Sequence, residues 1–312
     1  MKRRTAVILS AIVAVVLGGG AALTIWLLSQ PAGPEATVSA YLSALERGDG
    51  AAASALSDPR TAADAPVVFD ALAGASEWIT EASTGAATVD DLDASVDASF
   101  TLDGSAHSVT IGLSNASGTW LVTAPPVATV VARSTLGAGV VLGSGAGISM
   151  PFDTEESVTF ALLPGVYAIT AAPAGLLDGG KSITAVASAP IEIALAPTLG
   201  EAATAAAQTQ LTAYLAACTK PATTVPSACG IRVPWAADLA TLSGLKFRID
   251  AAPVLALAPD GSGFAATGGV LVATATGTTD AGDEASFSYR DAEWALRGGI
   301  AFTLDELVLE VW

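Results

Sequence analysis

Apolar residues dominate the start of this chain and then fall into two different periods. Thr5 to Leu28 is a run of 24 residues without a charge, and three cations at positions 2–4 precede it. At about 1.5 Å per residue, a helix of this length spans roughly 36 Å, enough to cross a hydrocarbon core of about 30 Å. The pattern predicts a cytoplasmic tail over 1–4, a transmembrane anchor over 5–28, and an extracytoplasmic remainder.

A cleavable secretory signal is the alternative reading of this run. Signal sequences have a shorter apolar core, roughly 7–15 residues, which ends in a small-x-small cleavage site. The run here is longer, its end from Trp26 to Pro31 has no such site, and Trp26 suits a membrane interface. We therefore expect an uncleaved, single-pass signal-anchor in the cell membrane, followed by a short linker over 29–33.

Residues 34–125 combine a helical period with a later alternation of period two. Apolar residues recur at helical spacing from Val38 to Leu45, and Gly48-Asp49-Gly50 ends the run. A second helix is predicted over Val67–Ala82. Alternating residues then predict three antiparallel strands, so this segment is expected to be an α+β domain.

The rest of the chain is expected to form two further domains. Residues 126–198 show no helical period and many Gly and Pro residues, which predicts a small all-β module. Residues 199–312 repeat the order of the first segment, with a helix over Glu201–Cys218 and strands after Gly244. The predicted fold class is therefore α+β, with two helix-plus-curved-antiparallel-sheet domains on either side of the β module.

The charge of the chain limits its partners. The net charge is −17, and without the basic tail 10 Lys and Arg residues face 30 Asp and Glu residues. A surface of this sign repels nucleic acid and anionic lipid headgroups, so we expect no nucleic-acid partner. A hydrophobic content of 52% with 14% charged residues allows packed cores and argues against a disordered chain.

Cys218 and Cys229 are the only cysteines, and 11 positions separate them. Outside the cytoplasm thiols tend to be oxidised, so a disulfide between them is expected. A metal site is the alternative, but the chain has a single His and two thiolates do not complete a zinc shell. We predict no metal and no cofactor.

The stretch from Pro34 to Ala53 joins an apolar helix containing a Tyr-Leu pair, a Gly-Asp stop and an Ala-rich second helix. It resembles the opening of nuclear transport factor-like domains in membrane-anchored extracytoplasmic proteins of actinobacteria, and Gln210–Leu215 is similar. The resemblance implies a cone-shaped α+β fold, whose curved sheet would be formed by the trio of strands that ends in Trp120. It implies no common chemistry, because members bind ligands, act as scaffolds or, rarely, catalyse.

The motifs that suggest catalysis are incomplete. Ser243-Gly244-Leu245-Lys246 matches a Ser-x-x-Lys pair, but Gly244 weakens a helix and Lys246–Asp250 alternates as a strand does. His107 is the single histidine, and no Gly-x-Ser-x-Gly motif accompanies it. A hydrolase is therefore the least favoured of the functions considered, and the chain is not expected to be an enzyme.

We expect a non-catalytic scaffold or partner-binding protein of the cell envelope, held at the membrane by its N-terminal helix and contacting an envelope protein. The alternative is a binding domain for a small apolar ligand, lodged between helix and curved sheet. Six aromatic residues are the candidates for lining such a pocket, although filling a core is their more common role: Tyr41, Trp78, Trp120, Tyr214, Trp235 and Trp294.

Overall fold

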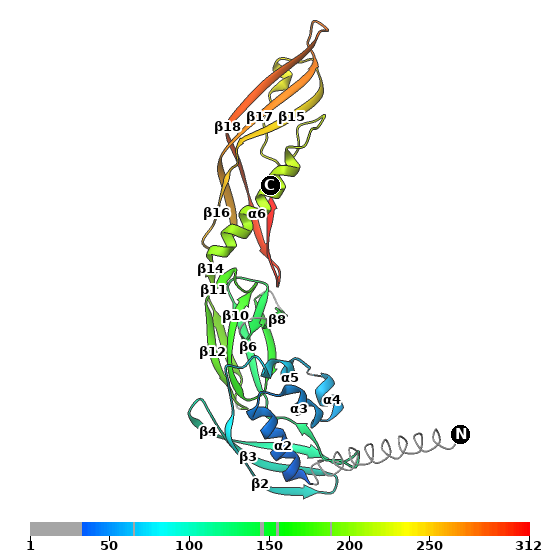
Figure 1. The fold of residues 1–312 in the computed structure, drawn as a ribbon, viewed down its shortest axis with the longest axis vertical. Coiled ribbons are helices and arrows are strands. Elements are labelled where there is room, and N and C mark those ends of the chain that lie inside the picture. The colour runs from blue at the N-terminus through cyan, green and yellow to red at the C-terminus, as the bar shows by residue number, and fades with distance from the viewer. Residues whose placement is uncertain (1–32, 65, 144–146, 154–155, 188) are drawn as a thin grey trace, which may run out of the picture. The chain divides into compact units, whose positions relative to one another are not determined.

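Strands make up most of the regular structure. The structure is a computed structural model, and it describes residues 33–64, 66–143, 147–153, 156–187 and 189–312 (Figure 1). Of the described residues 51% lie in strands and 19% in helices. The predicted α+β class is therefore wrong, because β-structure extends into segments whose apolar spacing had indicated helix.

The expected membrane anchor finds no support in the structure. Within the described ranges, no helix is long and apolar enough to cross a membrane. This finding contradicts the prediction of a single-pass membrane protein with a signal-anchor. The segments predicted as tail and anchor, 1–4 and 5–28, and most of the linker over 29–33, lie outside the described residues.

The chain divides into two compact units. The first runs to Val127 without Gly74–Ser76 and includes Leu163–Gly165, and the second holds the remainder. Among its described residues the first unit contains four helices, α2 (Pro34–Glu46), α3 (Gly50–Ala55), α4 (Pro59–Asp64) and α5 (Pro66–Leu72). Its strands are β1 (Glu77–Trp78), β2 (Thr80–Asp90), β3 (Asp93–Leu102), β4 (Ser105–Ser114) and β5 (Leu121–Ala124).

An antiparallel sheet in the order β2-β3-β4-β5 forms the first unit with α2 packed on one face. The inward positions of β3 are apolar and buried at every second residue from Ala94 to Leu102, as expected for a sheet with one solvated face. Helix α2 ends just before Gly48, as predicted, where Gly48 has a φ of 64°. Asp49 then caps the start of α3, because its carboxylate accepts a hydrogen bond from the N–H of Ala52 at 2.9 Å.

The predicted helix over Val67–Ala82 is wrong beyond Leu72. Helix α5 ends there, and β2 begins at Thr80. The apolar residues that suggested one helix are shared between the helix and the start of the sheet: Phe69 and Leu72 are buried in α5, and Ile79 lies buried just before β2.

The second unit begins with short strands in small sheets. Its first nine strands are β6 (Ala128–Ser134), β7 (Gly139–Leu142), β8 (Ile148–Pro151), β9 (Ser157–Leu162), β10 (Gly165–Ala172), β11 (Leu177–Asp178), β12 (Gly180–Ala185), β13 (Ile191–Leu195) and β14 (Thr198–Leu199). One sheet has the order β13-β6-β9, with β13 parallel to β6, and another pairs β10 with β7 and β12 and β7 with β8. Alternate residues of β6 and β10 are buried, as in a small β-sandwich.

The C-terminal part of the second unit holds one long sheet and one long helix. Its elements are α6 (Glu201–Cys218), η1 (Trp235–Ala237), β15 (Thr241–Ala251), β16 (Val254–Leu257), β17 (Gly263–Thr278), β18 (Glu284–Phe302) and β19 (Leu307–Val311). The antiparallel order is β15-β17-β18-β19, and β16 also pairs with β17. Helix α6 packs against the end of the sheet that contains β16 and β19 (Figure 1).

Two glutamine side chains of α6 bind the strands beside it. The Gln208 amide accepts a hydrogen bond from the N–H of Leu255 at 2.8 Å and donates one to the carbonyl of Pro253 at 3.4 Å. The Gln210 amide accepts from the N–H of Leu309 at 3.1 Å and donates to the carbonyl of Leu307. Each amide therefore takes the place of a neighbouring strand at an edge of the sheet.

Replacing Gln208 with Leu is expected to lower the free energy of unfolding by about 1–2 kcal/mol, because it leaves two partly buried backbone groups without their partner. Thr209→Ala is the matched control on the same helix, since the Thr209 hydroxyl bonds only to the carbonyl of Ala205 within α6. Chemical denaturation monitored by circular dichroism measures both variants. Equal stabilities for the two would contradict the assigned role of Gln208.

Candidate binding face on the C-terminal sheet

The part of the sheet farthest from α6 has two chemically different faces. Residues of β15 alternate here: Leu245, Phe247 and Ile249 are buried or half-buried, whereas Lys246, Arg248 and Asp250 are exposed. The register pairs Lys246 with Thr274 of β17, and Thr274 with Ser288 of β18. Because opposed residues of neighbouring strands lie on the same face, the exposed residues of all three strands form one surface.

The apolar face is covered by the chain between α6 and β15. Leu239, Leu245 and Ala275 form the buried centre of this contact. Residues packed around them come from the covering segment and from the three strands: Val225, Val233, Trp235, Leu242, Phe247, Ala285, Phe287 and Tyr289. The Tyr289 hydroxyl donates a hydrogen bond to Asp238 at 2.8 Å. Burial, reinforced by the Asp238 carboxylate, raises the pKa of Tyr289 to about 12.

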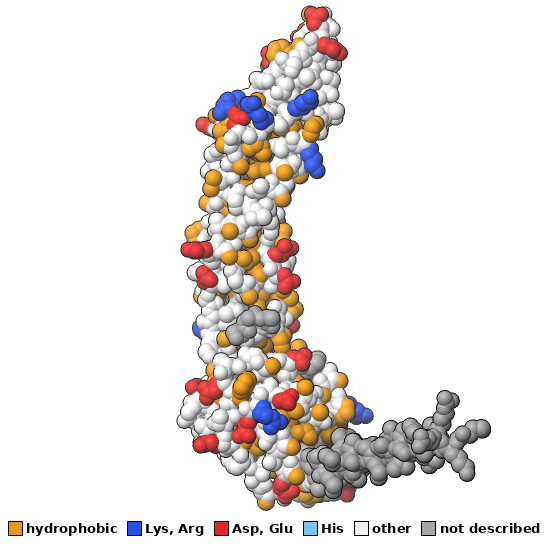
Figure 2. All heavy atoms as spheres, viewed as in Figure 1, with side chains coloured by type: hydrophobic (Ala, Val, Ile, Leu, Met, Phe, Trp, Pro, Cys, Tyr) orange, Lys and Arg blue, Asp and Glu red, His pale blue; other side chains and the backbone are white. Residues whose placement is uncertain are grey.

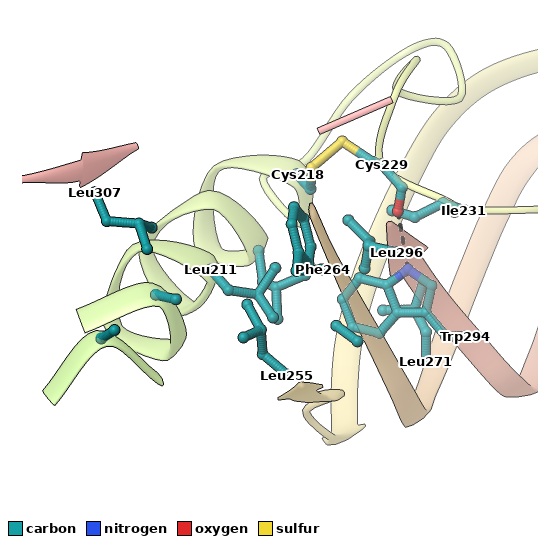
Figure 3. Close-up of a cluster of buried hydrophobic side chains, with 14 residues drawn as sticks. Leu211, Cys218, Cys229, Ile231, Leu255, Phe264, Leu271, Trp294, Leu296 and Leu307 are labelled. Atoms are coloured by element: carbon teal, nitrogen blue, oxygen red, sulfur yellow. Dashed lines mark hydrogen bonds between the residues drawn. A yellow bond between two sulfur atoms is a disulfide. The ribbon is translucent and has the colours of Figure 1, made fainter. Parts of the chain in front are cut away.

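The covering segment is fixed at its start by a disulfide and a buried tryptophan. Cys218 and Cys229 are bonded, with their Cα atoms 5.7 Å apart, which confirms the predicted pair. The indole N–H of Trp294 donates to the carbonyl of Cys229 at 2.9 Å, and the Tyr214 hydroxyl donates to the carbonyl of Ala228 at 2.8 Å. Figure 3 shows the disulfide at the end of α6, with Trp294 reaching it from the sheet.

The opposite face of the three strands is open to solvent, and we call it the open face. Its central rows consist of hydroxyl side chains, in which Thr274 lies opposite Ser288 and Thr276 opposite Ser286. The hydroxyls of Thr274 and Ser288 are 3.3 Å apart. The open face is defined by nine residues: Lys246, Arg248, Asp250, Val272, Thr274, Thr276, Ser286, Ser288 and Arg290.

Positive charge is in excess on the open face. Asp250 accepts a hydrogen bond from Arg248 at 2.9 Å and another from Arg290. The open face therefore carries three cations and a single carboxylate in a chain whose net charge is −17. Figure 2 shows the Lys and Arg side chains that gather around this part of the sheet.

The hydrogen bond from Arg290, with the charge of Arg248, holds the pKa of Asp250 below its usual range despite an opposing effect of burial. A lowered folded-state pKa contributes stability above the ordinary carboxyl pKa of about 3.9, and that stability is lost as the pH falls below it. Asp250 is thus ionised at neutral pH. Its two arginine contacts are solvent-screened, so they position the guanidinium groups more than they stabilise the fold.

Two shallow clefts adjoin the open face. One, of about 550 Å³, is lined by Gly230, Arg232, Arg290, Asp291, Ala292, Glu293 and Ala295. The other, of about 520 Å³, is lined by Ser243, Thr276, Gly277, Thr278, Glu284, Ala285 and Ser286. Both are open surface depressions with largely or partly polar linings, which suit contact with another macromolecule more than enclosure of an apolar ligand.

The aromatic residues predicted to line a pocket lie mostly in cores. Tyr41 of the first unit and Trp294 of the second have no exposed surface. Trp78 is 38% exposed, and its indole N–H donates to the carbonyl of Leu72 at 3.0 Å. Trp120 is half-buried at the start of β5.

The remaining two aromatic candidates belong to the second unit. Tyr214 packs against the same cluster as Trp294, and Trp235 packs against the neighbouring cluster around Leu245. None of the six aromatic residues lines any of five clefts found in the described parts of the chain. That they bind an apolar ligand stays a prediction.

The residues considered for catalysis are not arranged for it. Ser243 donates a hydrogen bond to the carbonyl of Thr276 at 3.0 Å, and it shares strand β15 with Lys246 in place of a helix. His107 packs beside Phe100, with ring centroids 5.8 Å apart. Over the ranges that the structure describes, no three His, Cys, Asp or Glu side chains are grouped to hold a metal ion.

Comparisons with protein-family models, curated proteins and solved structures return no match. The similarity of Pro34–Ala53 to nuclear transport factor-like domains therefore stays a prediction, and the function has to be argued from the chain itself.

Alternation in the sequence predicts the strand over Lys246–Asp250 but not the open face. The open face depends on the register of β15, β17 and β18, which brings Arg290 to Asp250 across a separation of 40 residues. Alternation in Ala285–Arg290 was a usable signal, because its small polar residues occupy every second position of a strand.

Proposed function

We propose that this chain is a non-catalytic partner-binding protein of an oxidising compartment outside the cytoplasm, and that its open face contacts an acidic protein partner. The observation that carries the proposal is the set of three exposed cations, Lys246, Arg248 and Arg290, around rows of hydroxyl side chains. The oxidised Cys218–Cys229 pair supports the compartment, because such bonds are rare where the cytosolic thiol pool reduces them.

An acidic partner suits this surface for two reasons. Arginine guanidinium groups match carboxylates with paired hydrogen bonds, and the short hydroxyl side chains add further donors without a large entropic cost. The negative charge elsewhere on the chain is screened over about 10 Å at an ionic strength near 0.1 M, so the local positive charge governs a close approach. Recognition through such a face changes mostly the association rate and the choice of partner.

A short, fluorescently labelled glutamate peptide tests the proposal, with binding to the full chain followed by anisotropy near 0.1 M salt. We expect saturable, salt-sensitive binding that the triple variant Lys246→Glu, Arg248→Glu and Arg290→Glu weakens at least about tenfold, a difference of about 1.4 kcal/mol. The matched control carries the same charge change at three exposed cations elsewhere: Arg60→Glu, Arg133→Glu and Lys181→Glu.

The control variant is expected to bind within about twofold of the unmodified chain, because its changed residues lie outside the open face. Equal losses in the two triple variants would show that net charge alone drives binding, and would overturn the proposal. So would an unmodified chain that fails to bind the peptide.

A further inference from the structure

Three edges of the C-terminal sheet are partly covered by other groups of the chain, and one is not. The outer edge of β16 is bound by Gln208 and that of β19 by Gln210. On the outer edge of β15, Leu245 exchanges two backbone hydrogen bonds with Ala222, at 3.0 and 2.6 Å. An uncovered edge is a template for pairing with another strand, and these contacts cover part of each of three edges.

The fourth edge is bare. Strand β19 pairs only with Gly298–Phe302 of β18, so it leaves the outer side of β18 unpaired nearer the β17–β18 turn. Along the seven residues Glu284–Arg290, the outer side receives no hydrogen bond from any residue that the structure describes. This stretch contains no Pro or Lys, residues that commonly protect exposed edges, and its charged residues, Glu284 and Arg290, stand only at its two ends.

The hydrogen bond within the β17–β18 turn determines which backbone groups of β18 face outward. The N–H of Thr279 donates to the carbonyl of Asp283 at 2.9 Å. Hydrogen-bonded pairs recur at every second residue of an antiparallel ladder, so Ala285, Phe287 and Tyr289 bond to β17. The N–H and C=O groups of the alternate residues therefore point to the bare edge: Glu284, Ser286, Ser288 and Arg290.

We infer that the bare edge of β18 pairs antiparallel with the same edge of a second copy of the chain, about a two-fold axis at Phe287. In this register each outward-facing residue lies opposite another, so their backbone groups can exchange hydrogen bonds. Glu284 lies opposite Arg290 of the partner copy, and the symmetry repeats this ion pair. Ser286 likewise lies opposite Ser288 of the partner copy.

The charges of Glu284 and Arg290 favour this register over its neighbours, and they favour a second copy of the chain as the partner strand. Moving the strands by two residues places Arg290 opposite Ser286 or Gly282, and both ion pairs disappear. The same edge is thus complementary to itself, which is the condition for a closed two-fold dimer. The pairing of β18 with β17 becomes irregular at Asp291–Glu293. The regular stretch of β18 that can pair with a second copy therefore ends at Arg290.

The resulting dimer is expected to be reversible. A ladder of seven residues from each copy is at the small end of specific interfaces, and the chains carry a net charge of −17 each. Dimerisation should therefore depend on protein concentration and should increase from low to moderate ionic strength, where the overall repulsion is screened while the backbone hydrogen bonds persist.

Sedimentation of the full chain over a range of concentrations tests the inference. Ser288→Pro removes an outward N–H but no hydrogen bond to β17, so we expect the dimer dissociation constant to rise at least about tenfold. Ser288→Ala keeps the N–H and is expected to dimerise like the unmodified chain. Thermal unfolding of both variants checks that the sheet is intact, and a folded Ser288→Pro variant that still dimerises would overturn the inference.

Cysteine cross-linking tests the register itself. Under mild oxidation a mixture of Ser286→Cys and Ser288→Cys chains should form a covalent dimer, because opposed Cα atoms about 5.5 Å apart lie within disulfide range. Each variant alone should cross-link much less. Equal cross-linking in the single variants would exclude the proposed two-fold axis.

A monomeric full chain at all concentrations would overturn the inference, even if its edge captured an extended segment of some other protein. The two tests are distinguishable, because sedimentation of the chain without peptide measures dimerisation, whereas anisotropy of the labelled glutamate peptide measures binding to the open face. Dimerisation can thus fail while the open face binds, or the reverse.

Discussion

Replacing Trp294 with Ala is expected to lower the free energy of unfolding of the second unit by about 3–5 kcal/mol. The side chain has no exposed surface and packs in the cluster of α6, β17 and β18 together with Leu271 and Leu296 (Figure 3). The substitution leaves a cavity and also leaves the carbonyl of Cys229 without its indole donor. Calorimetric or denaturant unfolding of the full chain measures the loss.

Trp294→Phe separates the two contributions. Phenylalanine keeps most of the apolar volume but has no N–H, so the expected loss is smaller, about 1–3 kcal/mol. Trp312→Ala serves as the control, because that side chain is 71% exposed and should change the stability by less than about 0.5 kcal/mol. Losses for Trp294→Ala no larger than those of the control would contradict the role assigned to the buried indole.

Removing the disulfide with Cys218→Ser and Cys229→Ser is expected to lower the free energy of unfolding by roughly 2.5–3 kcal/mol. The estimate comes from the conformational freedom that a bond across 11 positions removes from the unfolded chain. Denaturation of the double variant should match denaturation of the reduced natural chain. A double variant as stable as the oxidised chain would contradict the estimate.

The same double variant distinguishes structural support from recognition. The covering segment that follows Cys218 lies on the apolar side of β15–β18, whereas Lys246 and Arg248 lie on the other. Glutamate-peptide binding should therefore survive loss of the disulfide at temperatures where the second unit stays folded. Loss of binding without unfolding would show that the covering segment takes part in recognition.

Local signals in the sequence predicted several elements well. The end of α2 before Gly48 depends on one residue with positive φ, and the start of α3 depends on the capping carboxylate of Asp49; both are readable from residue type. Helix α6 ends at Cys218, as predicted, and the alternation over Val96–Leu102 corresponds to the buried side of β3. These elements are decided by neighbours in the sequence.

Elements decided by distant contacts were not predictable in the same way. Strand β2 consists largely of small and polar residues, so it has no clear apolar period, and its place is fixed by pairing with β3. The apolar residues Phe69, Leu72 and Trp78 have a spacing compatible with one helix, although the chain turns after Leu72. Such overrides explain why the predicted α+β class was wrong.

The open face shows the same limit for a site. Lys246 and Arg248 were placed on a strand from their alternation, but their partner Arg290 lies on a different strand. Only the pairing of β15, β17 and β18 brings the three cations together. A single sequence holds the residue types of such a surface but not the register that assembles it.

The uncharged side-chain amides of Gln208 and Gln210 cover the outer edges of β16 and β19 in the C-terminal sheet. Hydrogen bonds of neutral amides depend little on added salt, whereas the attraction between the guanidinium groups of the open face and a carboxylate is screened by it. Raising the ionic strength is therefore expected to weaken binding of the glutamate peptide while the C-terminal sheet stays folded.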